Sequence, residues 1–115
     1  MILVVMGSGK KIHVKTNGRY LVIDPSDILC CEADSNYTRI RLEGDEEVVT
    51  TRTLKEVSKD LPEARFCRCH HSWIVNLGKV RSYNMKELEL TNGMTLPVSR
   101  RRYNDLVWMI KKKRQ

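Results

Sequence analysis

Turn signals recur about every eight to twelve residues along this sequence, and this spacing limits the possible fold more than any other feature. The strongest are Asn17-Gly18 and Asn92-Gly93, because both residue types tolerate the positive φ of a tight hairpin turn. Asp34-Ser35-Asn36 and Glu43-Gly44-Asp45 mark two further turns. The sequence therefore predicts many short strands and a mostly β fold.

Alternating apolar and polar residues predict where the strands lie. The segment Ile12-His13-Val14 precedes the first Asn-Gly turn, and Tyr20 and Val22 follow it as the expected apolar positions of a hairpin. Another predicted strand, residues 73–76, must bury one side, and Ile74 is expected on that side. The remaining predicted strands are residues 28–33, 37–42, 48–51, 66–69, 80–83, 87–90 and 95–98.

Two segments have helical spacing instead. The first carries apolar residues one helical turn apart, namely Leu54, Val57 and Leu61. Thr53 followed by Glu56 fits a capping box and Pro62 stops the helix, so a short helix is predicted from about residue 53 to 61. Ser99 is expected to cap a C-terminal helix. The apolar face of that helix would hold Tyr103, Leu106, Val107 and Ile110.

The chain of 115 residues is expected to form one domain, residues 11–115, preceded by a flexible lead-in, residues 1–10. Its formal net charge is +7, from 21 Lys and Arg against 14 Asp and Glu. A small basic protein attracts polyanions, chiefly nucleic acid or an anionic membrane surface. The basic residues gather in two blocks, residues 100–102 and residues 111–114.

Targeting signals are not evident in the sequence. No apolar stretch reaches the roughly 18 residues of a membrane-spanning helix, and the apolar residues 1–6 lack the basic flank and cleavage site of a signal peptide. We therefore expect a cytoplasmic protein with no membrane partner. The four cysteines are expected to be reduced thiols rather than disulfides.

The segment from Cys67 to His71 carries the densest group of reactive side chains, and three interpretations compete. Two thiols, Cys67 and Cys69, and two imidazoles, His70 and His71, are ligand types that zinc prefers. On a strand, however, Cys67 and Cys69 share a face from which His70 points away, so one ion could not easily collect all four. A cysteine nucleophile is disfavoured, because adjacent residues do not easily reach thiolate–imidazole geometry. The third interpretation is a polar edge that presents donors to a nucleic acid.

Signatures of enzymes are otherwise missing from the sequence. Gly7-Ser8-Gly9-Lys10 lacks the spacing and context of a phosphate-binding loop, and no separated pair of carboxylates lies on an apolar background. We therefore expect a binding domain rather than an enzyme, with no cofactor. Arg100-Arg101-Arg102, directly after Ser99, is a second candidate site, because arginine forks bind guanine bidentately or clamp phosphates.

Together these segments resemble the LytTR family, the DNA-binding domain of many bacterial response regulators. The resemblance runs from about Lys11 to Ile110, and the histidine–x–serine–aromatic–x–valine–asparagine block that ends at Asn76 is its most diagnostic part. The order and spacing of four blocks carry it: residues 28–37, residues 53–61, residues 66–76 and residues 92–101.

The resemblance implies a fold and a mode of binding. The fold would be an elongated array of small antiparallel sheets with one short internal helix and a C-terminal helix. Loops rather than a recognition helix would enter successive major grooves of duplex DNA. The family often carries arginine at the position of His71. The implied DNA-binding residues are Asn36, Tyr37, Arg39, Arg68, His70, His71, Ser72, Ser99, Arg100, Arg101 and Arg102.

The leading hypothesis is therefore a transcriptional regulator that binds duplex DNA of specific sequence and self-associates on repeated half-sites. Family members usually carry a receiver or sensor domain, and these residues hold none, so a separate signalling protein is a further expected partner. One alternative is a general nucleic-acid or RNA-binding module, although the sequence has few aromatics for base stacking. The other is a zinc- or redox-responsive module built on Cys67, Cys69, His70 and His71.

Overall fold

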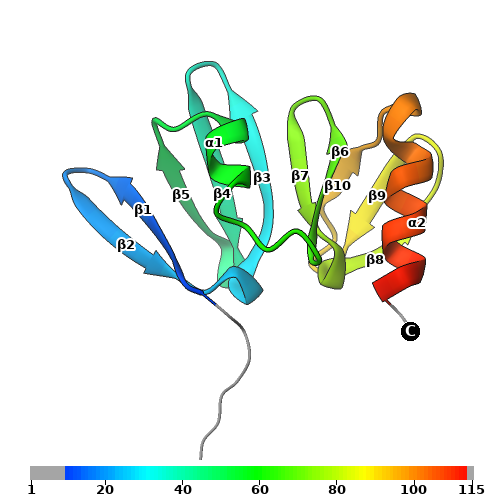
Figure 1. Cartoon of the computed structure of the whole chain (residues 1–115), viewed down its shortest axis with the longest axis horizontal. Helices are drawn as coiled ribbons and strands as arrows, with labels where there is room; N and C mark the ends of the chain where they lie inside the picture. The colour runs from blue at the N-terminus through cyan, green and yellow to red at the C-terminus, as the bar shows by residue number, and fades with distance from the viewer. Residues whose placement is uncertain (1–9, 114–115) are drawn as a thin grey trace, which may run out of the picture.

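Three antiparallel sheets and two helices make up most of the computed structural model, which describes residues 10–113 (Figure 1). The N-terminal hairpin pairs β1 (Ile12–Thr16) with β2 (Arg19–Ile23). The five-stranded central sheet has the order β5-β4-β3-β7-β6, with β3 Ile28–Asp34, β4 Tyr37–Leu42, β5 Glu46–Thr50, β6 Phe66–His70 and β7 Trp73–Asn76. The C-terminal sheet has the order β10-β9-β8, with β8 Val80–Tyr83, β9 Glu87–Leu90 and β10 Thr95–Pro97.

This architecture confirms the predicted fold class, including the short internal helix α1 (Leu54–Ser58) and the C-terminal helix α2 (Tyr103–Lys113). The expected lead-in, residues 1–10, lies outside the described residues except for Lys10, which has no regular secondary structure. No helix in residues 10–113 is long and apolar enough to cross a membrane.

The first hairpin forms as predicted, but the expected face of its second strand is wrong. Asn17 and Gly18 take positive φ values of 51° and 77°, and Thr16 pairs with Arg19, so the turn contains two residues. The resulting register sets Ile23 opposite Ile12 and Leu21 opposite Val14. Directly opposed residues share a face of the sheet, so Leu21 and Ile23 turn towards the core. The side chains of Tyr20 and Val22, the predicted apolar positions, are exposed.

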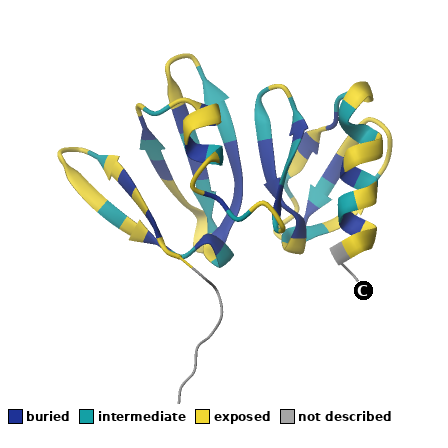
Figure 2. Ribbon diagram, viewed as in Figure 1, coloured by how far each residue is buried: buried dark blue, intermediate teal, exposed yellow. Residues whose placement is uncertain are grey.

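Two hydrophobic clusters lie on opposite sides of the central sheet, and alternation along its strands supplies both. Cys31 and Ile74 belong to the cluster that the hairpin and α1 cover, which we call the first cluster. Cys30 and Val75, their immediate neighbours, belong to the second cluster, which the C-terminal sheet and α2 cover. Ile74 is thus buried as expected. Figure 2 shows the buried residues concentrated on the strands, between the exposed turns.

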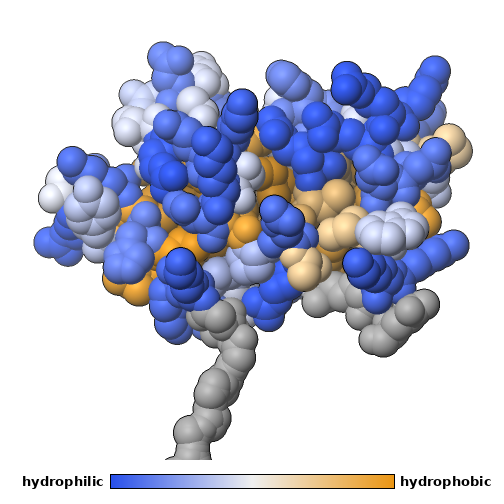
Figure 3. All heavy atoms as spheres, viewed as in Figure 1, coloured by the Kyte–Doolittle hydropathy of each residue, from blue (hydrophilic) through white to orange (hydrophobic). Residues whose placement is uncertain are grey.

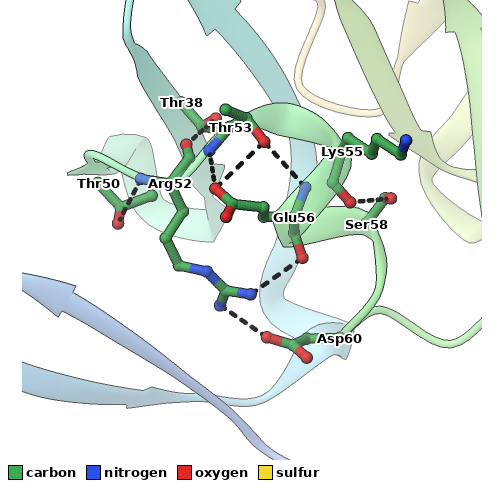
Figure 4. A network of polar contacts seen from close by, with 8 residues as sticks. All are labelled: Thr38, Thr50, Arg52, Thr53, Lys55, Glu56, Ser58 and Asp60. Carbon is green, nitrogen blue, oxygen red and sulfur yellow. Dashed lines mark hydrogen bonds and ion pairs between the residues drawn. The ribbon is translucent and has the colours of Figure 1, made fainter.

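The internal helix begins where the capping box predicts and ends earlier than expected. The Thr53 hydroxyl accepts a hydrogen bond from the Glu56 N–H at 3.1 Å, and the Glu56 carboxylate accepts one from the Thr53 N–H at 2.8 Å (Figure 4). The helix stops at Ser58 rather than near Leu61. The N–H groups of Asp60 and Leu61 bond to carbonyls three residues back, which is the pattern of a tighter turn.

The start of the C-terminal helix differs from the prediction. The Ser99 hydroxyl makes no capping hydrogen bond, and it is buried with no partner in the part of the chain that the structure describes. Arg100–Arg102 form a 3₁₀ turn, η4, and α2 begins only at Tyr103. Backbone contacts fix Ser99 instead, because its N–H donates to the Cys69 carbonyl at 2.9 Å. The predicted apolar face is confirmed for Leu106 and Ile110, which are buried, and for Tyr103, which packs on the second cluster. Val107 is half-buried, and the other residue of α2 that packs on this cluster is Met109.

Candidate nucleic-acid interface

Three polar segments gather along one edge of the molecule, and most of the predicted site residues lie in or beside them. They are the β3–β4 turn, the β6–β7 turn and η4, which Figure 1 shows at the upper edge. Figure 3 shows hydrophilic side chains along the same edge, above the apolar strip between the sheets. We call this surface the three-turn edge.

Backbone hydrogen bonds hold the three segments beside one another. Strands β3 and β7 are neighbours in the central sheet, and beyond the last residue pair of their ladder the Ala33 N–H donates to the Ser72 carbonyl at 2.9 Å. This bond joins the β6–β7 turn to the end of β3. The bond from Ser99 to the Cys69 carbonyl joins η4 to β6 in the same way. The edge is therefore a continuation of regular structure, which makes its geometry stiff.

The β3–β4 turn presents two of the predicted contacts. Ser35 takes a positive φ of 54°, and Asp34 pairs with Tyr37 across the turn. Asn36 is exposed at the tip, and the Tyr37 side chain follows it, 49% exposed. The turn therefore offers an amide and a phenol side by side.

Arg39 is placed on the strand behind this turn and is paired with acids. Its Nε donates to Asp34 at 2.7 Å and its Nη1 to Glu47 at 3.2 Å. The hydrogen bond and charge of Asp34, followed by the charge of Glu47, raise the pKa of Arg39. Both acids are missing from the sequence-based site, because only the pairing of β4 with β3 and β5 brings them to Arg39. A DNA contact by Arg39 would have to compete with two carboxylates.

The β6–β7 turn contains the diagnostic histidine block. His71 is exposed at its tip, whereas His70 and Ser72 are half-buried. The Ser72 N–H donates to Nδ1 of His70 at 3.1 Å. Arg68 donates from Nη2 to the His71 carbonyl at 2.9 Å, and its Nε is buried without a partner. Burial, followed by the charge of Arg102, lowers the pKa of Arg68.

The 3₁₀ turn η4 orients its three arginines differently. Arg100 and Arg101 are exposed, and Arg102 is half-buried. Side chains of a 3₁₀ turn project about 120° apart, so three successive arginines cannot all face one groove. Arg102 is the one whose charge acts on Arg68, which places it on the side of β6.

The cysteines lie behind the edge rather than on it. Cys30, Cys31 and Cys69 are buried and Cys67 is half-buried, and all four are free thiols. Burial raises the pKa of Cys30 and of Cys69 to about 12. Thiolates rather than thiols attack and bind metals, so these groups are held in the inert form at neutral pH. Within residues 10–113, no group of three or more His, Cys, Asp or Glu side chains is arranged to hold a metal ion.

A stacking platform for single strands is likewise not supported. Among the described residues, the exposed large aromatics are Tyr20 on β2, Tyr37 at the β3–β4 turn and Trp108 on α2. Only Tyr37 lies on the three-turn edge. Binding of single-stranded nucleic acid without sequence preference uses several aromatics along one groove.

The chain is similar to DNA-binding domains and regulators that are already known. The profile of the LytTr DNA-binding domain family matches residues 18–111. The chain is 34% identical over 83 residues to the transcriptional regulatory protein NatR of Bacillus subtilis, covering 65% of this chain and 35% of that protein. It is 29% identical over 98 residues to the sensory transduction protein LytT of Oceanobacillus iheyensis, covering 78% of this chain and 39% of that protein. The chain thus spans little more than a third of the length of these relatives.

A solved structure has the same fold. It is a LytTr DNA-binding domain from Bacillus cereus, which superposes with a TM-score of 0.75 at 23% sequence identity. The superposition covers 89% of this chain and 97% of that one. Most of this chain is therefore the counterpart of one whole domain.

Proposed function

The chain belongs to the LytTR family of DNA-binding domains, and from this premise we propose that it regulates transcription by binding specific duplex sequences through the three-turn edge. The observation that carries the proposal is the placement of three donor-rich segments on one edge, joined by backbone hydrogen bonds. NatR, a relative that is longer than this chain, is named as a transcriptional regulatory protein. The bacterial cytoplasm is the proposed place of action, because that is where the DNA lies.

The size of the molecule fits contact with successive major grooves. Its principal extents are 42 × 38 × 24 Å. Major grooves on one side of B-DNA recur about every 34 Å, so the molecule is long enough to lie across two of them. A two-stranded turn or a short loop is narrow enough to enter a groove about 12 Å wide.

The side chains on the edge suit two different tasks. We assign base reading to exposed groups that leave from fixed backbone, chiefly Asn36, His71 and Arg100, and phosphate contacts to Arg101 and Arg102. A bidentate arginine–guanine contact gives about 1–3 kcal/mol of discrimination between bases, whereas a phosphate contact carries no sequence information. Affinity is expected to fall by about 10³ between low and moderate salt if about six phosphates are contacted.

Arg100 and Arg102 form the pair of variants that tests this assignment. Arg100→Ala is expected to weaken binding to the best site by about 10- to 100-fold and to leave random duplex almost unchanged. Arg102→Ala is expected to weaken both by similar factors and to lower the slope of log affinity against log salt by about one. Arg100→Lys is expected to recover little, because an ammonium cannot reproduce the planar fork. Mobility shifts over a salt series give all these quantities.

Equal losses on specific and random duplexes for Arg100→Ala would show that Arg100 is a phosphate clamp.

Selection of bound sequences from a random duplex library then tests the function as a whole. Two preferred tracts about one helical turn apart are expected. Tighter binding of single-stranded RNA than of any selected duplex would contradict the proposal. The protein-to-DNA ratio on the selected site tests the proposed self-association on repeated half-sites. Capture of this chain by a phosphorylated receiver protein tests the proposed signalling partner.

A further inference from the structure

We propose that Arg68 and His70 are positioning residues, which hold the β6–β7 turn so that the side chain of His71, already assigned to base reading, leaves from a fixed backbone. The inference rests on the proposed function, because it assigns roles within the same DNA interface. In the sequence, the three side chains are equivalent candidates for contact with DNA. The structure separates them by what each one touches.

Arg68 and His70 bind the two ends of a single peptide bond. The carbonyl of His71 and the N–H of Ser72 belong to the same peptide unit. Arg68 donates to that carbonyl at 2.9 Å, and His70 accepts from that N–H at 3.1 Å. Because a peptide unit is planar, fixing its two polar groups fixes its orientation. Rotation of this peptide would break both hydrogen bonds together.

The following peptide is fixed as well. The Ser72 carbonyl accepts from the Ala33 N–H at 2.9 Å, which attaches the turn to β3. On the other side, the pairing of β6 with β7 shifts register between Arg68 and His70. Such a bulge changes the direction of the side chains around it. The backbone of His71 is therefore held from both sides.

The ring of His70 accepts the hydrogen bond from the Ser72 N–H at Nδ1, and this determines which ring nitrogen carries the proton. A nitrogen that accepts a hydrogen bond carries no proton, so neutral His70 must carry its proton on Nε2. The side chain is half-buried, at the end of β6. Its role therefore matches that of an asparagine in a turn, whose side chain accepts from the N–H two residues on.

Arg68 uses its guanidinium to bind the protein backbone, in a hydrogen bond that lies at the surface of the molecule. It is half-buried, and its Nε is shielded from solvent and has no hydrogen-bond partner among the described residues. Within residues 10–113, its side chain makes one hydrogen bond, to the backbone carbonyl of His71. His71, in contrast, is exposed at the tip of the turn. A side chain that reads a base edge has to leave from a backbone that is held in place, and the two neighbours provide that restraint.

Two substitutions of His70 distinguish positioning from DNA contact. The amide of asparagine lies near the place of Nδ1, whereas the amide of glutamine lies near that of Nε2. If His70 holds the turn through Nδ1, His70→Gln is expected to weaken binding of the selected duplex by about tenfold, and His70→Asn to recover most of that loss. Recovery by His70→Gln and loss in His70→Asn would show that His70 contacts DNA through Nε2, and would overturn the assignment. Urea unfolding of each variant, measured in the buffer of the binding assay, checks that the variant is folded before urea is added.

The salt dependence of binding provides the test for Arg68. Arg68→Met keeps much of the apolar stem and removes the donor and the charge. We expect specific affinity to fall by about tenfold while the salt slope stays that of the wild type, with Arg102→Ala as the matched variant that lowers the slope by about one. A drop in slope of about one for Arg68→Met would show a phosphate contact and would contradict the positioning role.

Library selection tests the role of His71. We expect His71→Arg, the residue that the family often has here, to change the preferred base at one position of the site, and His70→Asn and Arg68→Met to leave the preferred sequence the same. An unchanged preference in His71→Arg would overturn the inference. Failure of the wild-type chain to prefer any duplex would instead refute the proposed function, so the two failures are distinguishable.

Discussion

At the scale of single residues, Ile74 shows how strictly the central sheet is packed. Its side chain is 3% exposed and belongs to the first cluster, although its neighbours in β7 face the second. Ile74→Ala is expected to lower the free energy of unfolding by about 2–5 kcal/mol, because the lost transfer energy and the remaining cavity add together. Urea unfolding monitored by circular dichroism measures this loss. A value below about 0.5 kcal/mol would contradict the packing described for β7.

The buried thiols give a pH dependence at the same scale. Burial raises the pKa of Cys30 and of Cys69 from 9.0 to about 12. Between these values the unfolded chain has released protons that the folded chain still holds, so the free energy of unfolding must fall as the pH rises. The contribution is complete below about pH 9 and is lost progressively up to about pH 12. Urea unfolding in the presence of a reductant, at a series of pH values, measures this fall.

The double variant Cys30→Ala/Cys69→Ala is the control for this prediction. Tyrosines and lysines also titrate in this range, but they are common to both proteins. The variant is therefore expected to show a shallower fall with pH than the wild type. Equal slopes in the two proteins would mean that the thiols ionise as readily in the folded chain as in the unfolded one.

At the scale of the secondary structure elements, the two helix starts form a matched pair. The Thr53 hydroxyl accepts from the Glu56 N–H and completes a capping box, whereas the Ser99 hydroxyl is buried with no partner within residues 10–113. Thr53→Ala is expected to cost about 1 kcal/mol of the free energy of unfolding. Ser99→Ala is expected to cost nothing or to stabilise slightly, because it removes a buried hydroxyl whose hydrogen bond is not made. Thermal unfolding of the two variants compares them, and a larger loss for Ser99→Ala would contradict the start described for α2.

At the scale of the whole molecule, the two clusters share one sheet and are expected to unfold together. Strands β3 and β7 each contribute side chains to both clusters. Loss of either cluster would leave a face of the central sheet exposed, so neither half has a complete core alone. Trp73 packs on the second cluster, and in a Trp108→Phe variant it is the remaining tryptophan. Far-ultraviolet circular dichroism and the fluorescence of Trp73 in this variant should therefore give the same transition midpoint in urea. Separated midpoints would show that the two halves unfold independently.

Much of the fold was determined by local sequence. The two Asn-Gly turns, the alternation in the central strands and the capping box at Thr53 involve residues within a few positions of each other. Their geometry therefore depends on backbone sterics and on short-range hydrogen bonds. The blocks of the LytTR family lie in the sequence itself, and they predicted the fold and the DNA-binding character together. Local sequence also determined that the Tyr20 side chain lies on the exposed face of the hairpin, because the two-residue turn before it sets the register of the strands.

The tertiary structure alone decided which residues meet at the three-turn edge. The order β5-β4-β3-β7-β6 brings Ser72 to Ala33, and this contact between residues far apart in the chain does not follow from the spacing in the sequence. The same holds for Ser99, whose backbone is fixed by Cys69, thirty positions away, so its hydroxyl is not needed as a cap. Such contacts depend on which strands become neighbours, and strand order is set by the burial of whole faces in two clusters. Local sequence fixes each turn, and the packing of the sheets gives the turns their common edge.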